Sequence, residues 1–225
     1  MAKISFKCLV LDHDDTTVKS TPDIHYPQWV ETLEALRPET KMTLEEFMNH
    51  NCEIGFFRMC EEVMHFTDHE KKTQDTMWRE YMRNHIASFY EGMPEIITDF
   101  HRAGGVICVC THNSETHILR DYAAQFGGEF EPDMIFDYDK YPGRIKPDPF
   151  ALKEIMRIYG FTPNEMLMVD DMKPGYDMAK SVGVPFAGAG WSHIVPKVKE
   201  VMRENSDFYL ETTEQLRALL FKEDE

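Results

Sequence analysis

The chain has 225 residues, and its 24 basic and 40 acidic side chains give a net charge of −16 at pH 7. This negative charge argues against nucleic acid and anionic membrane surfaces as partners, because both would repel the protein. No apolar run approaches the roughly 20 residues of a membrane span, and the opening residues are too few for a signal peptide. The five cysteines have no C-x-x-C spacing. We therefore expect a cytoplasmic protein whose partner is a small molecule.

Six short apolar runs in the sequence have the length of β-strands. They lie at residues 6–11, 106–110, 134–136, 166–169, 185–188 and 208–210. Because these runs are continuous and do not alternate with polar residues, they indicate strands covered on both faces. Helical patterns separate the later runs, at residues 94–104, 114–127, 148–160 and 176–183. This alternation predicts an α/β fold with a doubly wound parallel sheet, that is, a Rossmann-like core.

About 75 residues between the first strand and the alternating region contain no strand-like run. This segment is rich in charge and has helical spacing. We therefore predict a helical cap domain, residues 18–92, inserted into a core formed by residues 1–17 and 93–225. The cap should stand over the carboxyl ends of the strands, where ligands bind in open α/β sheets. The last three residues, 223–225, have the composition of a loose tail.

Polar side chains follow several of these strands at one predicted edge of the sheet. Asp12 follows the first strand, Thr111 follows the second, and Lys146 lies in the loop GRIKPDP. Asp170 and Asp171 follow the run MLMV. Phosphoryl transfer through an aspartate needs such a set, because one carboxylate attacks phosphorus while a divalent cation screens it from the phosphate anion. The clustered carboxylates are hard oxygen ligands of the kind that Mg²⁺ prefers.

Four motifs in this order resemble those of the haloacid dehalogenase (HAD) superfamily. DHDDT at residues 12–16 matches the pattern D-x-D-x-T, and Thr111 ends a segment similar to the second motif. KPDP, which begins at Lys146, is similar to the third motif, and VDDMKPG at residues 169–175 resembles the fourth. STPDIHYPQW at residues 20–29 is similar to the opening of the cap in the phosphoglycolate phosphatase and β-phosphoglucomutase branch. The resemblance implies a HAD-like phosphoric monoester hydrolase.

The resemblance also implies roles for the carboxylates of these motifs. Asp12 would be the nucleophile, and Asp14 the general acid and base. Mg²⁺ would be held by Asp12, by the backbone carbonyl of Asp14 and by Asp171, with Asp170 bound directly or through water. These assignments come from the family and are carried over one position at a time.

Thr111 and Lys146 would hold the phosphoryl group, since one offers a hydroxyl donor and the other a point charge. Arg144, in the same loop, is the alternative cation. The first motif departs from the family pattern at two positions: Asp15 replaces the usual glycine, and His13 replaces an apolar residue. Because aspartate tolerates a left-handed backbone better than most residues, we expect the turn at Asp15 to be preserved.

Three functions are compatible with these motifs. The first is a Mg²⁺-dependent phosphatase that hydrolyses a small phosphorylated metabolite. The second is a phosphomutase, which would form the same aspartyl phosphate and return the group to a sugar; fold and motifs do not separate it from the first. The third is a non-catalytic protein that responds to phosphate. The identity of the substrate and the oligomeric state stay open.

Several further side chains have no assigned role. Four histidines invite a zinc site, namely His13, His25, His112 and His193, but their spacing matches no compact ligand motif. We expect structural or solvated roles for them, with substrate contact as the alternative. Trp78, Arg79 and Trp191 could shape the substrate pocket, although aromatic residues at helical spacing are usually part of a core.

Overall fold

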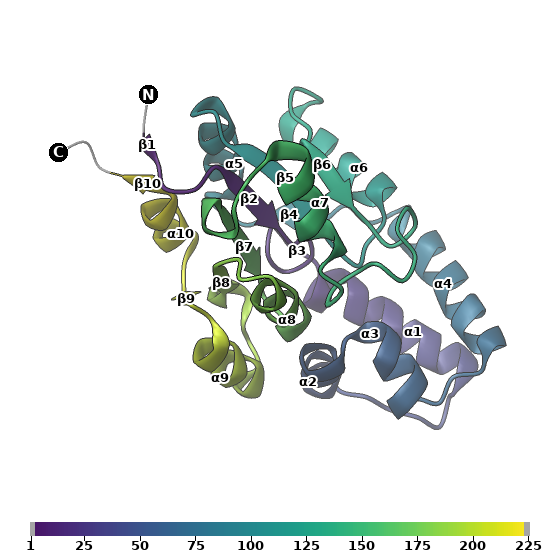
Figure 1. Ribbon diagram of the computed structural model, residues 1–225. Helices are drawn as coiled ribbons and strands as arrows, with labels where there is room; N and C mark the ends of the chain where they lie inside the picture. The colour runs from purple at the N-terminus through teal and green to yellow at the C-terminus, as the bar shows by residue number, and fades with distance from the viewer. Residues whose placement is uncertain (1–2, 223–225) are drawn as a thin grey trace.

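The computed structural model describes residues 3–222 and contains a central sheet of six parallel strands (Figure 1). The order of the strands across the sheet is β6-β5-β2-β7-β8-β9. Their bounds are Cys8–Leu11 (β2), Val106–Cys110 (β5), Met134–Phe136 (β6), Met166–Asp170 (β7), Phe186–Ala189 (β8) and Phe208–Leu210 (β9). The predicted doubly wound parallel sheet is therefore confirmed.

Strand β2 lies at the centre of the sheet because its residues are apolar on both faces. All four of its side chains are fully buried. Leu11 pairs with Val109 of β5 on one side and with Val169 of β7 on the other. The chain segments that follow these three strands therefore leave the sheet side by side, at its carboxyl edge.

Helices cover both faces of the sheet. The first face packs against α5 (Met93–Arg102), α6 (Glu115–Phe126) and α10 (Thr213–Leu220). The second face packs against α7 (Phe150–Tyr159), α8 (Lys173–Ser181) and α9 (Pro196–Asn205). Short 3-10 turns at Pro163–Glu165 and Gly190–Ser192 complete the connections. The two hydrophobic clusters are separated by the sheet, as in other α/β folds.

Between β2 and α5 the chain forms a group of helices, which lies at the lower right of Figure 1, on the side toward which β2 points. The group contains α1 (Tyr26–Leu36), α2 (Leu44–Ile54), α3 (Phe56–Arg58) and α4 (Asp68–Met82). A π-helical turn at Thr21–His25 leads into α1, and a second one at Met59–Val63 lies between α3 and α4. The cap boundaries at residues 18 and 92 stay a prediction.

The sequence analysis did not predict two small antiparallel sheets. Strand β3 (Val18–Lys19) pairs with β4 (Ser88–Phe89), within the segment in which no strand was expected. Strand β1 (Lys3–Ile4) pairs with β10 (Phe221–Lys222). The expectation of a strand-free segment was therefore wrong, because strands of two residues are too short to show any periodicity.

The ends of several elements differ slightly from the predicted ones. The first strand begins at Cys8 instead of residue 6, and the helix predicted to start at residue 176 begins at Lys173. The tail expected at residues 223–225 lies outside the described part of the chain. None of the helices within residues 3–222 combines the length and the apolar character that a membrane crossing needs. The cytoplasmic location stays a prediction.

Candidate active site

The first motif forms a tight loop directly after β2. Asp12 extends the strand, since its backbone N–H donates to the carbonyl of Val169 over 2.9 Å. Asp15 has a φ of 56°, which confirms the left-handed turn expected there. Its buried carboxylate accepts hydrogen bonds from the backbone N–H groups of Ser20 and Thr21, each at 3.0 Å. Asp15 therefore fixes the path of the following residues, which the usual glycine could not do.

Lys146 lies on the floor of the site, between two carboxylates. Its Nζ is 2.7 Å from Asp12 Oδ1 and 2.5 Å from Asp170 Oδ2. Burial alone would lower the pKa of Lys146, but the charges of these two aspartates raise it above its ordinary value. The lysine is therefore an ammonium ion held at Asp12. Arg144, the alternative cation, is exposed and lies against the ring of Phe150.

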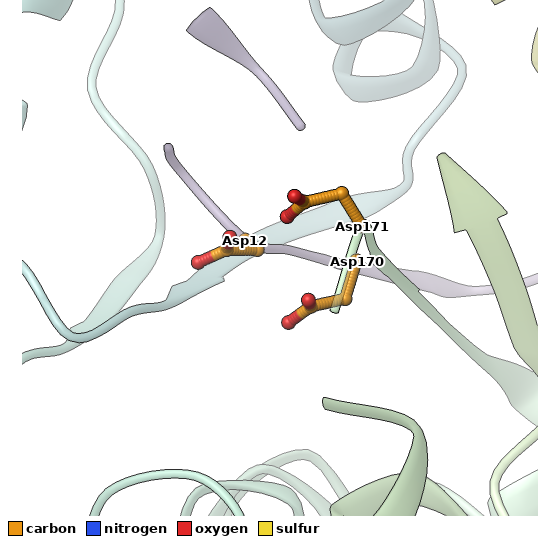
Figure 2. Close-up of side chains that lie close together, drawn as sticks. All are labelled: Asp12, Asp170 and Asp171. Atoms are coloured by element: carbon orange, nitrogen blue, oxygen red, sulfur yellow. The ribbon is translucent and has the colours of Figure 1, made fainter. Parts of the chain in front are cut away.

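Asp12, Asp170 and Asp171 bring three carboxylates together (Figure 2). One oxygen from each lies within 4.8 Å of the others, and all three residues are buried. Burial raises the pKa of Asp12 to about 7, with a further contribution from Asp170 and an opposing one from Lys146. Burial also raises the pKa of Asp171 well above its usual range. Such mutually repelling oxygens fit a hard divalent cation, which would relieve the repulsion.

A close backbone approach supports the position of Asp170. Its Oδ1 accepts a hydrogen bond from the backbone N–H of Met172 at 2.8 Å. A Cβ atom added to Gly175, in the first turn of α8, would lie 2.2 Å from Asp170 Oδ2. The glycine of VDDMKPG is therefore required, because any larger residue would push this carboxylate away.

The carboxylate of Asp14 lies outside that group and faces the helices of the insertion. Its Oδ1 accepts a hydrogen bond from His25 Nε2 at 2.7 Å, and its Oδ2 accepts one from Asn113 Nδ2 at 3.0 Å. Trp78 Nε1, on α4, donates to His25 Nδ1 over 3.3 Å. Because a carboxylate only accepts, His25 Nε2 carries a proton that is directed at Asp14. Burial would lower the pKa of His25, but the charge of Asp14 and the hydrogen bond to it raise this pKa above its ordinary value.

Thr111 and the residues after it complete the floor. Thr111 is buried at the end of β5, and its Oγ1 accepts a hydrogen bond from the backbone N–H of Asn113 at 3.1 Å. The Asn113 side chain accepts hydrogen bonds from the backbone N–H of Ser114 and from His117 Nδ1. These contacts leave its amide group free to donate to Asp14. Sequence reasoning missed Asn113, which belongs to none of the motif positions carried over.

Residues 6–183 match the model of the haloacid dehalogenase-like hydrolase family. The chain belongs to this family. The resemblance seen in the four motifs is thereby confirmed, and with it the prediction of a HAD-like phosphoric monoester hydrolase at the level of the family.

Named relatives and solved structures agree with this membership. A phosphoglycolate phosphatase of Vibrio vulnificus is 23% identical over 227 residues, which cover 96% of this chain and 96% of the relative. A phosphoglycolate phosphatase of Mesorhizobium japonicum is 32% identical over 111 residues, which cover 49% of this chain and 48% of that protein.

Two solved structures share the fold. CbbY of Rhodobacter sphaeroides, determined with xylulose-(1,5)-bisphosphate, has a TM-score of 0.72 and 18% identity; the match covers 92% of this chain and 94% of CbbY. A haloacid dehalogenase-like family protein of Streptococcus pneumoniae has a TM-score of 0.69 and 14% identity, over 95% of this chain and 98% of the other.

The unassigned histidines of this HAD-like hydrolase do not form a zinc site. Within residues 3–222, the only place where three or more His, Cys, Asp or Glu side chains could bind one metal ion is the group of Asp12, Asp170 and Asp171. His13 is buried and donates to Asp121 over 3.2 Å. His112 donates to the carbonyl of Lys146, and His193 to the carbonyl of Asp171. Three of the four therefore support loops of the HAD motifs.

A cavity of about 170 Å³ opens above the floor, between the sheet edge and the helices of the insertion. It is lined by the carboxylates of the motifs, by Thr111 and Lys146, and by side chains of α2, α3 and α4. Trp78 is among the lining residues, although the sequence favoured a place in the core for it. Trp191 is not, because its Nε1 donates to the carbonyl of Thr16 and braces the first motif loop. Arg79 forms ion pairs with Asp75 and Asp139 instead.

Proposed function

We propose that this protein is a Mg²⁺-dependent phosphatase that hydrolyses a small phosphorylated metabolite through an aspartyl-phosphate intermediate on Asp12. The observation that carries the proposal is the buried Asp12 carboxylate on the cavity floor, 2.7 Å from the Lys146 ammonium and grouped with Asp170 and Asp171. Family membership and the names of the bacterial relatives support phosphate monoesters as substrates.

In the first step, an Asp12 oxygen attacks phosphorus while the bond from phosphorus to the ester oxygen breaks. Asp14 gives its proton to the departing oxygen, so that an alcohol leaves instead of an alkoxide. Lys146 and the hydroxyl of Thr111 hold the non-bridging oxygens of the phosphoryl group. The position of all four side chains around one cavity supports these roles.

In the second step, Asp14 takes a proton from a water molecule, which attacks the phosphorus of the aspartyl phosphate. The bond from phosphorus to Asp12 breaks and inorganic phosphate is released. Hydrogen bonds from His25 and Asn113 hold the Asp14 carboxylate over the cavity, in position for both proton transfers.

The residues that would hold Mg²⁺ are Asp12, Asp170 and Asp171, together with the backbone carbonyl of Asp14. Mg²⁺, when bound, supplies the positive charge that screens Asp12 from the incoming phosphate anion. Since the donors are all oxygen atoms and three are carboxylates, the set suits a hard divalent ion better than zinc.

Release of inorganic phosphate from an aryl phosphate, measured with Mg²⁺ and with an excess of chelator, tests the proposal. We expect hydrolysis only with the metal ion, and none by Asp12→Asn. The exposed Asp23 provides a matched control, because Asp23→Asn removes one carboxylate away from the cavity. Equal rates with and without metal would contradict the proposal. Transfer of labelled phosphate from Asp12 to a sugar instead of water would identify a phosphomutase.

A further inference from the structure

The cavity of this phosphatase carries a strongly one-sided set of charges. Six carboxylates line it, those of Asp12, Asp14, Asp15, Asp75, Asp170 and Asp171. Lys146 is the only lysine or arginine among the described lining residues. Its ammonium group is already within 2.7 Å of Asp12 and 2.5 Å of Asp170. Lys146 is thus already paired with carboxylates at the floor of the cavity, where the phosphoryl group would bind.

The two histidines that line the cavity offer no unpaired positive charge to a ligand. Burial lowers the pKa of His112 to about 4, so its ring is neutral at physiological pH. His25 is already paired with a carboxylate of the cavity, because its Nε2 donates to Asp14 Oδ1 at 2.7 Å. Arg79 is not available either, because Asp75 and Asp139 hold its guanidinium at 2.9 and 2.7 Å.

Apart from His25 and Asp75, the residues of the insertion that line the cavity are uncharged and mixed in character. The uncharged polar groups include three carboxamides, from Gln28, Asn51 and Gln74. The flat surfaces are aromatic, from Phe47, Phe56, Phe57 and Trp78, and Phe57 stacks on Tyr138 with 4.6 Å between the ring centroids. Carboxamides can donate to and accept from hydroxyl groups, and aromatic faces pack against C–H groups or attract cations.

From this arrangement we infer that the leaving group of the substrate carries no negative charge. The inference rests on the proposed function and narrows its substrate class to phosphate monoesters of uncharged or cationic alcohols. A carboxylate on the leaving group would lose its water in this part of the cavity and would meet no unpaired cation there. It would also face Asp14 and Asp75, and juxtaposed like charges oppose binding.

A series of three compounds of equal size tests the inference: 2-phosphoglycolate, 2-hydroxyethyl phosphate and 2-aminoethyl phosphate. Their leaving groups end in a carboxylate, a hydroxyl and an ammonium group, respectively. We expect 2-phosphoglycolate to have the lowest kcat/KM, at least about tenfold below 2-hydroxyethyl phosphate. The inference is overturned if the carboxylated compound reacts as well as the hydroxylated one.

A positive charge introduced beside these carboxamides should reverse this preference. Gln74 is buried on α4 and lines the cavity. Gln74→Lys should raise kcat/KM for 2-phosphoglycolate by about tenfold relative to 2-hydroxyethyl phosphate, because it supplies the missing cation. Gln74→Met, which has a similar length and no charge, should leave the ratio as it is. A similar change of the ratio in both variants would show that charge is not the cause.

Binding to the Asp12→Asn protein, measured by calorimetry with Mg²⁺, separates this inference from the proposed function. The measurement requires no turnover and does not depend on the reactivity of the leaving group. Tighter binding of 2-hydroxyethyl phosphate than of 2-phosphoglycolate supports the inference, even if the parent protein hydrolyses neither. Equal or tighter binding of 2-phosphoglycolate overturns it, and so does failure of all three compounds to bind.

Discussion

Asp14 is positioned by side chains from two distant parts of the chain. His25 comes from the π-helical turn that precedes α1, and Asn113 comes from the segment after β5. Each donates to a different oxygen of the carboxylate. Burial would raise the pKa of Asp14, but these surroundings, His25 above all, lower it below its ordinary value. The contacts thus favour the carboxylate form in the free protein, which is the form that would activate water in the second step. The protonated form required in the proposed first step would have to arise as the anionic phosphate binds, because a nearby negative charge raises the pKa of a carboxyl group.

Replacement of Asp14 by asparagine should separate substrates by their leaving groups. Asp14→Asn keeps a hydrogen-bond acceptor for His25 but cannot protonate an alkoxide. With an alkyl phosphate, phosphorylation of Asp12 should slow by about 10²- to 10⁴-fold. With an acyl or aryl phosphate, the first step should survive and the phosphoenzyme should accumulate, as seen by acid quench and mass spectrometry. Parent-like activity of the variant on alkyl phosphates would remove Asp14 from its proposed role.

Asp171 and Lys146 should differ in how their loss affects the enzyme. Asp171→Ala should weaken Mg²⁺ activation and turnover together, because the carboxylate is assigned to the metal ion. Lys146→Ala should lower kcat/KM by about 10²-fold at saturating Mg²⁺, because the ammonium is assigned to the phosphoryl group. Rates measured across a Mg²⁺ titration distinguish the two. An unchanged Mg²⁺ dependence in Asp171→Ala would contradict its assignment, provided that circular dichroism shows a folded protein.

Individual residues differ in how far the sequence could predict them. Asp12, Thr111 and Asp170 could be placed together because each ends a strand, and strand ends are visible as the ends of apolar runs. Asn113 and His25 could not be paired with Asp14, because neither spacing nor residue type reveals which side chains the fold brings to one carboxylate. Their assignment needed the three-dimensional contacts.

At the scale of the elements, α4 is a charged helix that begins with a complete capping box. The hydroxyl of Thr67 accepts from the backbone N–H of Glu70, and the Glu70 carboxylate accepts from the backbone N–H of Thr67. The same carboxylate accepts two hydrogen bonds from Arg37, just beyond the end of α1. These hydrogen bonds connect the start of α4 to the end of α1. Further along, α4 contributes Gln74 and Trp78 to the lining of the cavity.

Thr67→Ala should therefore destabilise the protein by about 1 kcal/mol, the usual cost of losing a threonine N-cap. The midpoint of urea unfolding measures this change. Thr76 supplies the control, since it is an exposed threonine in the interior of the same helix. Thr76→Ala should leave stability unchanged or slightly higher, because alanine is the better helix former. Equal losses in the two variants would argue against a capping role for Thr67.

The elements of the core were predictable because burial leaves a simple pattern. Strands β2, β5 and β7 are covered on both faces, so nearly all of their residues are apolar. The pair β3 and β4 has no such pattern, because Lys19 and Ser88 are exposed and each strand has two residues. These two strands pair because the fold brings distant parts of the chain together, and the local sequence does not encode that contact.

Across the whole molecule, burial of ionisable groups links stability to pH. His117, on α6, is 7% exposed; it packs edge-on against Trp78 and donates to Asn113. Burial, aided by the charge of Arg120, lowers its pKa to about 4, although Asp121 and Asp14 oppose this and Arg79 adds to it. The unfolded chain therefore binds a proton at His117 below about pH 6.5, where the folded protein does not.

The stabilising contribution of neutral His117 should accordingly be present at pH 7.5 and be lost as the pH falls toward 5. His117→Gln keeps an N–H donor for Asn113 and removes the titration. Between these pH values, we expect the free energy of unfolding to fall by about 1 kcal/mol more in the parent than in the variant. This figure is smaller than the pKa difference alone would give, because solvent screens part of the effect. Urea unfolding at both pH values measures it. The same pH dependence in both proteins would contradict the assignment.

The pairing of β3 with β4 also determines how the molecule can change over evolution. Val18 lies opposite Phe89 and Lys19 opposite Ser88. The chain therefore enters and leaves the insertion through two adjacent, paired strands. A segment with adjacent ends can be lengthened, shortened or exchanged without altering the distance that the sheet must bridge. Residues 20–87 can therefore be replaced by a segment of different length or structure while the ends stay in place. Substitutions in this segment can therefore alter the part of the cavity formed by α2, α3 and α4 while the motif loops at the sheet edge stay as they are.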